Sequence, residues 1–354
     1  MNVTRKKLNT YNRINLYVGG HLVNCEEVSK LIEENYHIRP LNIEKRKNIY
    51  KITASTGNYC LKIINYEFKH FYFIVSVIEH LRKNGFDSTP EIERTRDNKN
   101  YIKVGDAYGY LIPWIRSRNS DYKIDIELKG AAKKLNELHK CSEGFTIDNN
   151  MNPRIGWFKW IETYETRIEE ILDFKKRIHQ KFYKSDFDIL YLEVMNDEIE
   201  RGKRAIEKLK NSNYMRIMEE DMMKLSVCHH DYAHHNVLID NKENYHIIDF
   251  DYCILDSPLH DLSSLAIRAM KDGNWSEEKF NFIINSYSDD IKLDKKRIML
   301  GFMEFPQDYW QVGLQYYWER QPWSEERFMK KITDYIKDRE KREVFIKKMY
   351  ERGQ

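Results

Sequence analysis

One polar stretch, set between short apolar segments, constrains this chain more than any other part of its sequence. VCHHDYAHHNVLID occupies residues 227–240, and the apolar segments LSVC and NVLI on its two sides are typical of short strands. A third such segment, YHIIDF at residues 245–250, follows and carries Asp249 at its end. The pattern predicts a loop followed by a small β-hairpin, with polar residues at the ends of the strands.

The spacing of the polar residues matches that of a kinase-type catalytic loop. His229-x-Asp231 is followed after four residues by Asn236, and Asp249 comes thirteen residues later. Phosphoryl transfer from ATP needs metal ions that bridge phosphate oxygens and a carboxylate that orients the attacking hydroxyl. We therefore predict that Asp231 is the catalytic base, assisted by Asn236. Asn236 and Asp249 offer the hard oxygen ligands that Mg²⁺ prefers, and His229 is expected to hold the loop by hydrogen bonds.

Four histidines in the same stretch raise the alternative of a transition-metal site built from imidazoles. They form two adjacent pairs, His229–His230 and His234–His235, and adjacent residues of an extended strand point to opposite faces. Only about half of them could therefore converge on one ion. No H-E-x-x-H motif is present, and the five cysteines lack C-x-x-C spacing, so we expect them to be reduced and mostly buried thiols.

A kinase also needs a lysine on a central strand of its N-terminal lobe, where it holds the α- and β-phosphates. Lys62 lies in YCLKII (residues 59–64), which together with IYKITAS (residues 49–55) predicts a β-hairpin. A strand lysine alone is weak evidence, but its combination with the catalytic-type loop favours this role. The segment YLIPWI (residues 110–115) is expected to connect the two lobes and to contact adenine, with the contacts assigned to Leu111, Ile112 and Trp114.

The remaining patterns predict a β-rich N-terminal part and a mainly helical C-terminal part. Helical periodicity occurs at residues 25–36, 68–86 and 124–140, and two further strand candidates flank the turn at Gly105. Two long charged segments, at residues 157–182 and 187–211, have apolar residues at three- and four-residue intervals and predict a helical hairpin. The last hundred residues are expected to form helices broken at Pro306 and Pro322.

Composition sets limits on the partners. The chain has 354 residues, which allows two domains, and its net charge of +3 gives no reason to expect a nucleic-acid partner. No apolar run approaches the roughly 20 residues of a membrane span. The basic N-terminal segment at residues 1–18 lacks the apolar region of a signal peptide, so we expect the protein to be cytoplasmic when it is made.

Together these motifs resemble the aminoglycoside phosphotransferase and choline kinase branch of the protein-kinase-like fold. DSPLHDL (residues 256–262) matches the D-x-P-x-x-D-L element of that branch, in which the second acid, here Asp261, supports the catalytic loop. Within the branch the chain is most similar to the CotS-type spore coat proteins of endospore-forming bacteria. The marks are the HHD-type loop, the IDFD strand and an aromatic-rich segment at residues 305–328.

This resemblance covers residues 25–350 and implies an α+β, bilobal protein-kinase-like fold. The small β-rich N-lobe would comprise residues 1–115, and the larger helical C-lobe residues 116–354, including the helical hairpin at 157–211. The resemblance implies ATP and Mg²⁺ as cofactors, an acceptor that carries a hydroxyl group, and other spore coat proteins as partners. It also implies synthesis in the mother cell followed by deposition in the spore coat.

Two features depart from the kinase pattern. Residues 42–50, where a phosphate-covering loop is expected, contain no glycine, so nucleotide binding is expected either to be weakened or to rely on side chains such as Lys45, Arg46 or Lys47. The acid that pairs with Lys62 is also not fixed by the sequence. Glu79 is the acid well inside the helix at 68–86, and Glu67 is the alternative.

Two functions therefore stay open. The chain is either an ATP- and Mg²⁺-dependent phosphotransferase acting on a small molecule or glycan, or a catalytically silent structural component of the spore coat. The glycine-free segment favours the structural role. The complete set Asp231, Asn236 and Asp249 favours the enzyme, because carboxylates kept close together without a metal repel one another. An aminoglycoside acceptor would want an acidic pocket, whereas the helical hairpin is mixed in charge.

Overall fold

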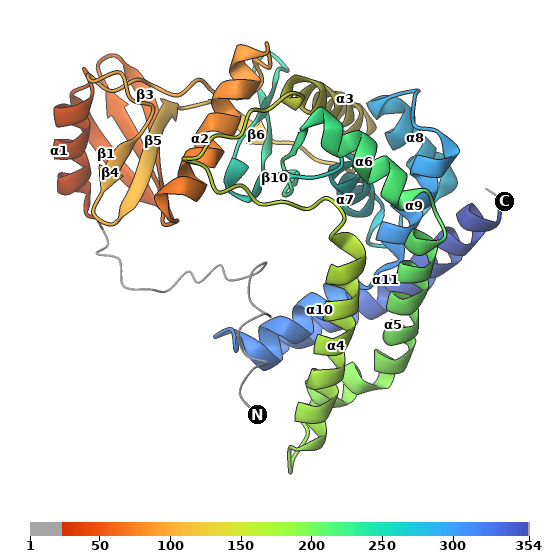
Figure 1. Cartoon of the computed structure of the whole chain (residues 1–354). Coiled ribbons are helices and arrows are strands. Elements are labelled where there is room, and N and C mark those ends of the chain that lie inside the picture. Colours follow the sequence, from red (N-terminus) through yellow and green to blue (C-terminus); the bar gives the residue numbers. More distant parts are fainter. Residues whose placement is uncertain (1–22, 353–354) are drawn as a thin grey trace. The chain divides into compact units, whose positions relative to one another are not determined.

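A computed structural model describes residues 23–352 (Figure 1). Two compact units make up this part of the chain. The first comprises the described residues up to Val75 together with Glu91–Trp114, and the second comprises Ser76–Pro90 together with the described residues from Ile115 onward. The predicted absence of a signal peptide concerns residues 1–18, which lie outside the described residues.

The first unit is built on a five-stranded antiparallel sheet with the strand order β1-β2-β3-β5-β4. The helix α1 (Cys25–Asn35) packs on it through Val28 and Ile32, which meet the strand residues Tyr50, Ile52 and Leu61 in one buried cluster. Asn24 begins this helix with a reciprocal capping box with Glu27. The strands are β1 (Pro40–Arg46), β2 (Ile49–Ala54), β3 (Gly57–Ile64), β4 (Ile102–Val104) and β5 (Ala107–Pro113).

The glycine-free segment at residues 42–50 forms most of a hairpin rather than an open loop. Strand β1 pairs with β2 as far as Arg46 opposite Ile49, so only two residues make the turn. Lys47, the first of them, has φ 56°, a left-handed conformation that glycine usually supplies. A lysine therefore occupies a left-handed position that glycine usually takes.

The second unit is mainly helical and contains two small sheets, β7 with β10 and β6 with β8 and β9. Its short strands are β6 (Ser117–Asn119), β7 (Val227–Cys228), β8 (Val237–Asp240), β9 (Tyr245–Ile247) and β10 (Ile254–Leu255). Its helices are α3 (Asp125–Ser142), α4 (Trp160–His179), α5 (Asp186–Lys210), α6 (Tyr214–Lys224), α7 (Leu259–Met270), α8 (Glu277–Tyr287), α9 (Leu293–Glu304), α10 (Gln307–Gly313) and α11 (Glu325–Glu351), with a 3-10 turn, η1 (Phe250–Tyr252), and a π-helical turn, η2 (Leu314–Trp318).

The helix α2 (Phe68–Lys83) begins in the first unit, but its second half and the following loop, residues 76–90, belong to the second. Hydrogen bonds explain this division. Asn84 Nδ2 donates to the Cys141 carbonyl at 2.8 Å, and the Ser88 carbonyl accepts from Ile247 N at 2.7 Å. Residues 76–90, expected in the N-lobe, are thus held by the helical unit.

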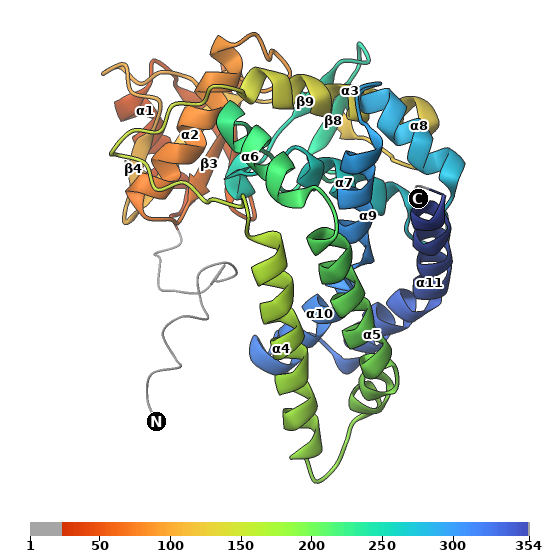
Figure 2. The same cartoon turned by 45° about the vertical axis from the view of Figure 1, so that its right-hand side comes forward.

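The predicted helical hairpin is present as α4 and α5, which lie side by side and extend beyond the other helices of their unit (Figures 1 and 2). Much of the aromatic-rich segment at residues 305–328 packs against it. Tyr191 and Tyr309 stack with centroids 4.1 Å apart, and each hydroxyl donates to the other residue's carbonyl oxygen. Phe187 stacks on Tyr316 at 4.2 Å. These contacts give the aromatic segment a structural role.

The predicted helices and strands are otherwise confirmed within a few residues at each end. The helices of the last hundred residues break at Pro306 and Pro322, as predicted, because proline cannot donate to the preceding turn. The helix α6 was not predicted, and it shortens the strand expected at LSVC to Val227–Cys228. Within residues 23–352, no helix has both the length and the apolar character that a membrane crossing requires.

Candidate functional site

Asn236 and Asp249 lie at the same end of the β8–β9 hairpin. Val237, the first residue of β8, pairs with Ile247, the last residue of β9. Asn236 immediately precedes that pair and Asp249 follows it by two residues, with Ile248 N donating to the Asn236 carbonyl at 3.0 Å. Asp249 has φ 69°, so the chain turns sharply at this carboxylate.

A close approach to α3 fixes the position of this hairpin. A Cβ atom at Gly130 would lie 2.2 Å from the Tyr245 ring, so only glycine lets the ring of β9 lie against the helix. The loop before the hairpin is tied to the same helix, because Tyr232 Oη donates to the Ala131 carbonyl at 2.8 Å. One helix thus supports both the loop and the hairpin.

Asp231 and Asn236 contact each other directly across the loop. Asn236 Nδ2 donates to the Asp231 carbonyl at 2.9 Å and to Asp231 Oδ2 at 3.1 Å. Because the amide nitrogen is engaged in this way, the Asn236 Oδ1 atom is the one that can coordinate a cation. The Asn236 side-chain oxygen and the Asp249 carboxylate fit a small hard divalent cation such as Mg²⁺ in donor chemistry.

His229 holds the loop to the end of the hairpin. Its ring is buried, Nε2 donates to the Ile248 carbonyl at 2.9 Å, and Nδ1 accepts from Asp231 N at 3.3 Å. Donation from one nitrogen and acceptance at the other are the pattern of a neutral imidazole with the proton on Nε2. His229 therefore connects the backbone of Asp231 to the backbone just before Asp249.

Asp261, at the start of α7, supports the loop by accepting hydrogen bonds from its backbone. Its Oδ2 accepts from His229 N at 2.6 Å and its Oδ1 from His230 N at 2.8 Å. Burial alone would raise the pKa of Asp261, but the hydrogen bond from His139 and the nearby His260, whose Nδ1 lies 3.7 Å from Oδ1, outweigh it and hold that pKa well below its usual value. Asp261 is therefore a buried carboxylate anion that orders the loop backbone.

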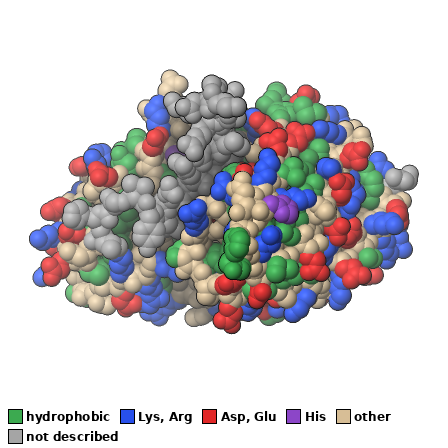
Figure 3. All heavy atoms as spheres, turned by 90° about the horizontal axis from the view of Figure 1, so that it is seen from below, with side chains coloured by type: hydrophobic (Ala, Val, Ile, Leu, Met, Phe, Trp, Pro, Cys, Tyr) green, Lys and Arg blue, Asp and Glu red, His purple; other side chains and the backbone are tan. Residues whose placement is uncertain are grey.

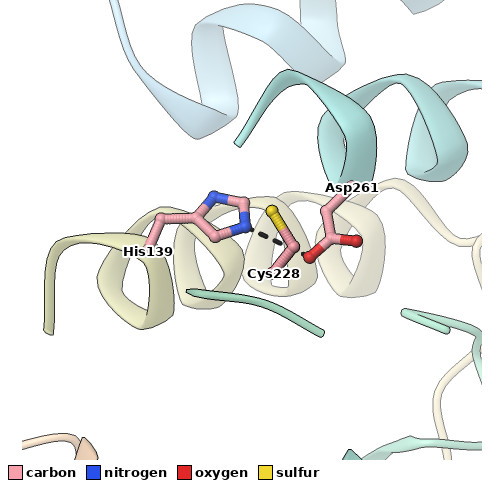
Figure 4. Close-up of side chains that lie close together, drawn as sticks. All are labelled: His139, Cys228 and Asp261. Atoms are coloured by element: carbon pink, nitrogen blue, oxygen red, sulfur yellow. Dashed lines mark hydrogen bonds and ion pairs between the residues drawn. The ribbon is translucent and has the colours of Figure 1, made fainter. Parts of the chain in front are cut away.

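His139, Cys228 and Asp261 converge from α3, β7 and α7, as Figure 4 shows, with one potential ligand atom of each within 4.8 Å of the others. Hydrogen bonds account for this cluster. His139 Nε2 donates to Asp261 at 3.2 Å, and the Cys228 thiol donates to the Ser257 carbonyl at 3.2 Å. Burial raises the pKa of Cys228 well above its ordinary value, so the thiolate that a zinc site needs is disfavoured.

The four histidines of the loop have separate partners. His230 stacks on His260 with centroids 4.3 Å apart, and burial followed by the neighbouring His260 lowers its pKa well below the ordinary value. His234 and His235 contact each other edge to face at 5.3 Å. His229 donates to the Ile248 carbonyl. The four rings therefore do not converge on one imidazole-lined metal site.

Arg268 is a site residue that sequence reasoning missed. Its Nη2 donates to Asp231 Oδ1 at 2.8 Å, while Asn236 donates to the other oxygen of the same carboxylate. Arg268 follows Asp261 by seven residues on α7, and residues seven apart lie on one face of a helix. That spacing was the signal in the sequence that could have identified it.

The predicted nucleotide residues of the first unit lie on β3 and β5 or just after them. Lys62 is 6% exposed and pairs with Ile49 and Tyr110 on the two neighbouring strands, so it lies at the centre of the sheet. Leu111 is buried opposite Leu61. Ile112 follows on the same strand, and the backbone of Trp114, just after it, donates to the Asn58 carbonyl at 2.8 Å.

Glu79 lies in the half of α2 that belongs to the second unit, whereas the alternative acid, Glu67, precedes that helix in the first unit. The pairing of Lys62 with either acid stays a prediction.

Three comparisons with known proteins agree with this geometry. The family described as "Spore coat putative kinase YutH" matches residues 29–349. Spore coat protein S of Bacillus subtilis (strain 168) is 20% identical over 323 residues, which is 89% of this chain and 91% of that protein.

Among solved structures, an aminoglycoside phosphotransferase from Alicyclobacillus acidocaldarius is similar with a TM-score of 0.78 at 18% identity, covering 96% of this chain and 99% of that one. Spectinomycin phosphotransferase APH(9)-Ia, solved with ADP and spectinomycin, has a TM-score of 0.64 at 16% identity, covering 90% and 95%. Choline kinases are among the further structural neighbours. The predicted α+β, kinase-like fold is confirmed.

Proposed function

The chain belongs to the spore coat family described as "Spore coat putative kinase YutH", and we propose that it is an ATP- and Mg²⁺-dependent phosphotransferase. Its acceptor would be a hydroxyl group of a small molecule or glycan. The observation that carries this proposal is the contact between Asp231 and Asn236 at the end of the hairpin that also bears Asp249. The family supports deposition in the spore coat, and we propose that synthesis takes place in the mother cell.

In the proposed reaction Asp231 receives the proton of the acceptor hydroxyl as the hydroxyl oxygen forms a bond to the γ-phosphorus. The bond from that phosphorus to the bridging oxygen breaks, and ADP leaves with the electron pair. Arg268 and Asn236 hold the two oxygens of the Asp231 carboxylate in position. Asn236 and Asp249 would hold Mg²⁺, which when bound neutralises charge on the phosphate oxygens.

The nucleotide contacts are proposed from the first unit. Lys62, buried at the centre of the sheet, would hold the α- and β-phosphates. The backbone of Leu111, Ile112 and Trp114 would contact adenine. A solved relative of the fold contains ADP, which supports nucleotide binding without defining it for this chain.

The positive charge of Arg268 beside Asp231 affects which acceptors can approach the proposed base. Arg268 places a guanidinium 2.8 Å from the carboxylate that would receive the hydroxyl proton. A polycationic acceptor would be repelled by this group, whereas a neutral or anionic one would not. We therefore propose that the acceptor carries no positive charge next to its reacting hydroxyl, unlike an aminoglycoside.

A catalytically silent component of the spore coat is the second candidate, and two observations favour it. The turn between β1 and β2 contains Lys47 and no glycine, and the Arg268–Asp231 ion pair occupies the proposed base. The buried network around Asp261 would then serve only to stabilise the fold.

Nucleotide titration of the purified chain separates the two candidates. We expect calorimetry to show ATP binding that depends on Mg²⁺, and Asp249→Asn to weaken it by about tenfold or more, because one charged ligand of the metal is lost. Asp231→Asn is the matched control, since it changes the same charge at a position that should not contact the metal. Absence of binding by well-folded wild-type protein would establish the silent component instead.

A further inference from the structure

The tip of the α4–α5 hairpin, residues 174–185, concentrates positive charge. It contains five lysine or arginine residues and no acid, although the whole chain has a net charge of only +3. Lys176 and Lys184 are exposed, whereas Arg177 pairs with Asp173 and Lys181 pairs with Asp188, two acids just outside this range. The tip is therefore far more basic than the molecule as a whole.

Two aromatic side chains stand out at the same tip. Phe182 is 88% exposed and Tyr183 is 83% exposed, and their rings pack edge to face with centroids 4.6 Å apart. Seen from this end of the hairpin, the surface carries exposed hydrophobic side chains among lysine and arginine side chains (Figure 3). Exposed aromatic rings of this size are unfavourable in water unless another phase or partner receives them.

The loop is braced on both sides of the aromatic pair. Lys181 Nζ donates to the buried Asp188 carboxylate at 2.7 Å and lies over the Tyr316 and Tyr317 rings, 5.2 Å from each centroid. On the other side, Ser185 caps α5 in a reciprocal box with Asp188. Because the backbone is held before and after them, Phe182 and Tyr183 are presented outward instead of folding back onto the hairpin.

From this arrangement we propose that the hairpin tip docks on a bilayer surface rich in anionic phospholipid. Aromatic side chains favour the interfacial region of a bilayer, and each basic residue near an anionic surface adds attraction. Phe182 and Tyr183 enter that region, and Lys176 and Lys184 face the headgroup phosphates. The tip rests on the bilayer and does not cross it.

The geometry favours a bilayer over other anionic partners. Two aromatic side chains offer roughly 400 Å², about half of the roughly 800 Å² that each partner buries in a stable protein interface. Because the planes of the two rings are nearly perpendicular, the pair does not form a parallel platform on which successive bases of a nucleic acid could stack. A bilayer needs neither a large complementary surface nor a flat stacking face.

The test uses the full chain and sedimentation with vesicles of phosphatidylglycerol, compared with vesicles of phosphatidylcholine. At about 0.1 M salt we expect binding to the anionic vesicles alone, weakening as salt is raised. Replacing both Phe182→Ser and Tyr183→Ser, or both Lys176→Gln and Lys184→Gln, should weaken binding by roughly tenfold or more. Phe182→Trp should retain it, with an emission shift to the blue on vesicle addition.

The matched control replaces Lys129→Gln and Lys133→Gln, two exposed lysines of α3, and should bind as the wild type does. All the tip changes are at exposed positions, so circular dichroism should be unchanged. Absence of binding to anionic vesicles would overturn the proposal, as would equal binding to both lipids. The proposal would also be overturned if neither the wild type nor the variants bound vesicles, while the wild type bound nucleic acid and the tip variants did not. None of these outcomes depends on phosphoryl transfer.

Discussion

Among single residues, Arg268 has the most direct consequence for the chemistry proposed here. Replacing Arg268 with glutamine keeps a hydrogen-bond donor but removes the positive charge beside Asp231. We expect the ratio of kcat/KM for cationic over neutral acceptors to rise by roughly tenfold, since removing one unit charge a few Å from another near a protein surface is worth on the order of 1 kcal/mol. The measurement is ADP release over a panel of hydroxylated acceptors.

Arg268→Lys is the control for this change, because it retains the charge and alters only the geometry. Nucleotide affinity should be unchanged in both variants. Equal shifts of acceptor preference in the lysine and glutamine variants would show that charge is not the cause, and the proposed exclusion of cationic acceptors would then be wrong.

The buried carboxyl of Asp256 gives a second prediction at this scale, one that concerns stability. Burial raises the pKa of Asp256 to about 6, although its Oδ2 accepts from Trp160 Nε1 at 2.9 Å. A raised pKa in the folded state means that the unfolded chain gives up its proton first, so the stability contributed by this group falls as pH rises from about 4 to 6. Asp256→Asn cannot lose a proton and should not show this fall.

We therefore expect the free energy of unfolding of Asp256→Asn, relative to wild type, to increase by up to roughly 3 kcal/mol between pH 4 and 7. Urea unfolding at several pH values gives this difference. Asp173→Asn is the control. Burial would raise the pKa of Asp173, but hydrogen bonds from Arg177 and Trp318 outweigh it and lower that pKa, so the difference for this variant should be flat over the same range. A flat difference for Asp256→Asn would contradict the raised pKa.

At the scale of secondary-structure elements, local patterns predicted most of the site but not the distant partners of its residues. The spacing of His229, Asp231, Asn236 and Asp249 predicted a loop and hairpin because each contact there joins residues close in sequence. The partners of Asp261 and Asp231 come from elsewhere: His139 lies on α3, and Arg268 lies near the other end of α7. Such contacts depend on how helices pack, which periodicity alone does not determine.

The same limit explains the differences in the fold. The segment at residues 42–50 was expected as a loop, yet pairing with β2 makes it a strand with a two-residue turn. The second half of α2 has the apolar pattern of one continuous helix, so the sequence gives no sign that residues 76–90 belong with the helical unit. In the second case, hydrogen bonds to the distant residues Cys141 and Ile247 hold this segment.

For the whole molecule, the open question is whether the spore coat uses the catalytic set or only the fold. Asp231 is about one-third exposed and pairs with Arg268 at the surface of the loop, so Asp231→Asn should fold normally. We expect spores of the host strain carrying Asp231→Asn to contain as much of this protein as wild-type spores, as measured in coat extracts.

If catalysis is what the coat requires, those spores should nevertheless show the same coat defect as spores that lack the protein, because the variant supplies the scaffold without the base. Coat permeability, compared among wild-type, Asp231→Asn and null spores, gives the measurement. Lys203→Gln, which breaks only an exposed pair with Glu200, is the matched control and should behave as wild type. Normal Asp231→Asn spores beside defective null spores would assign the protein a structural role, with the kinase-like fold kept for its surfaces.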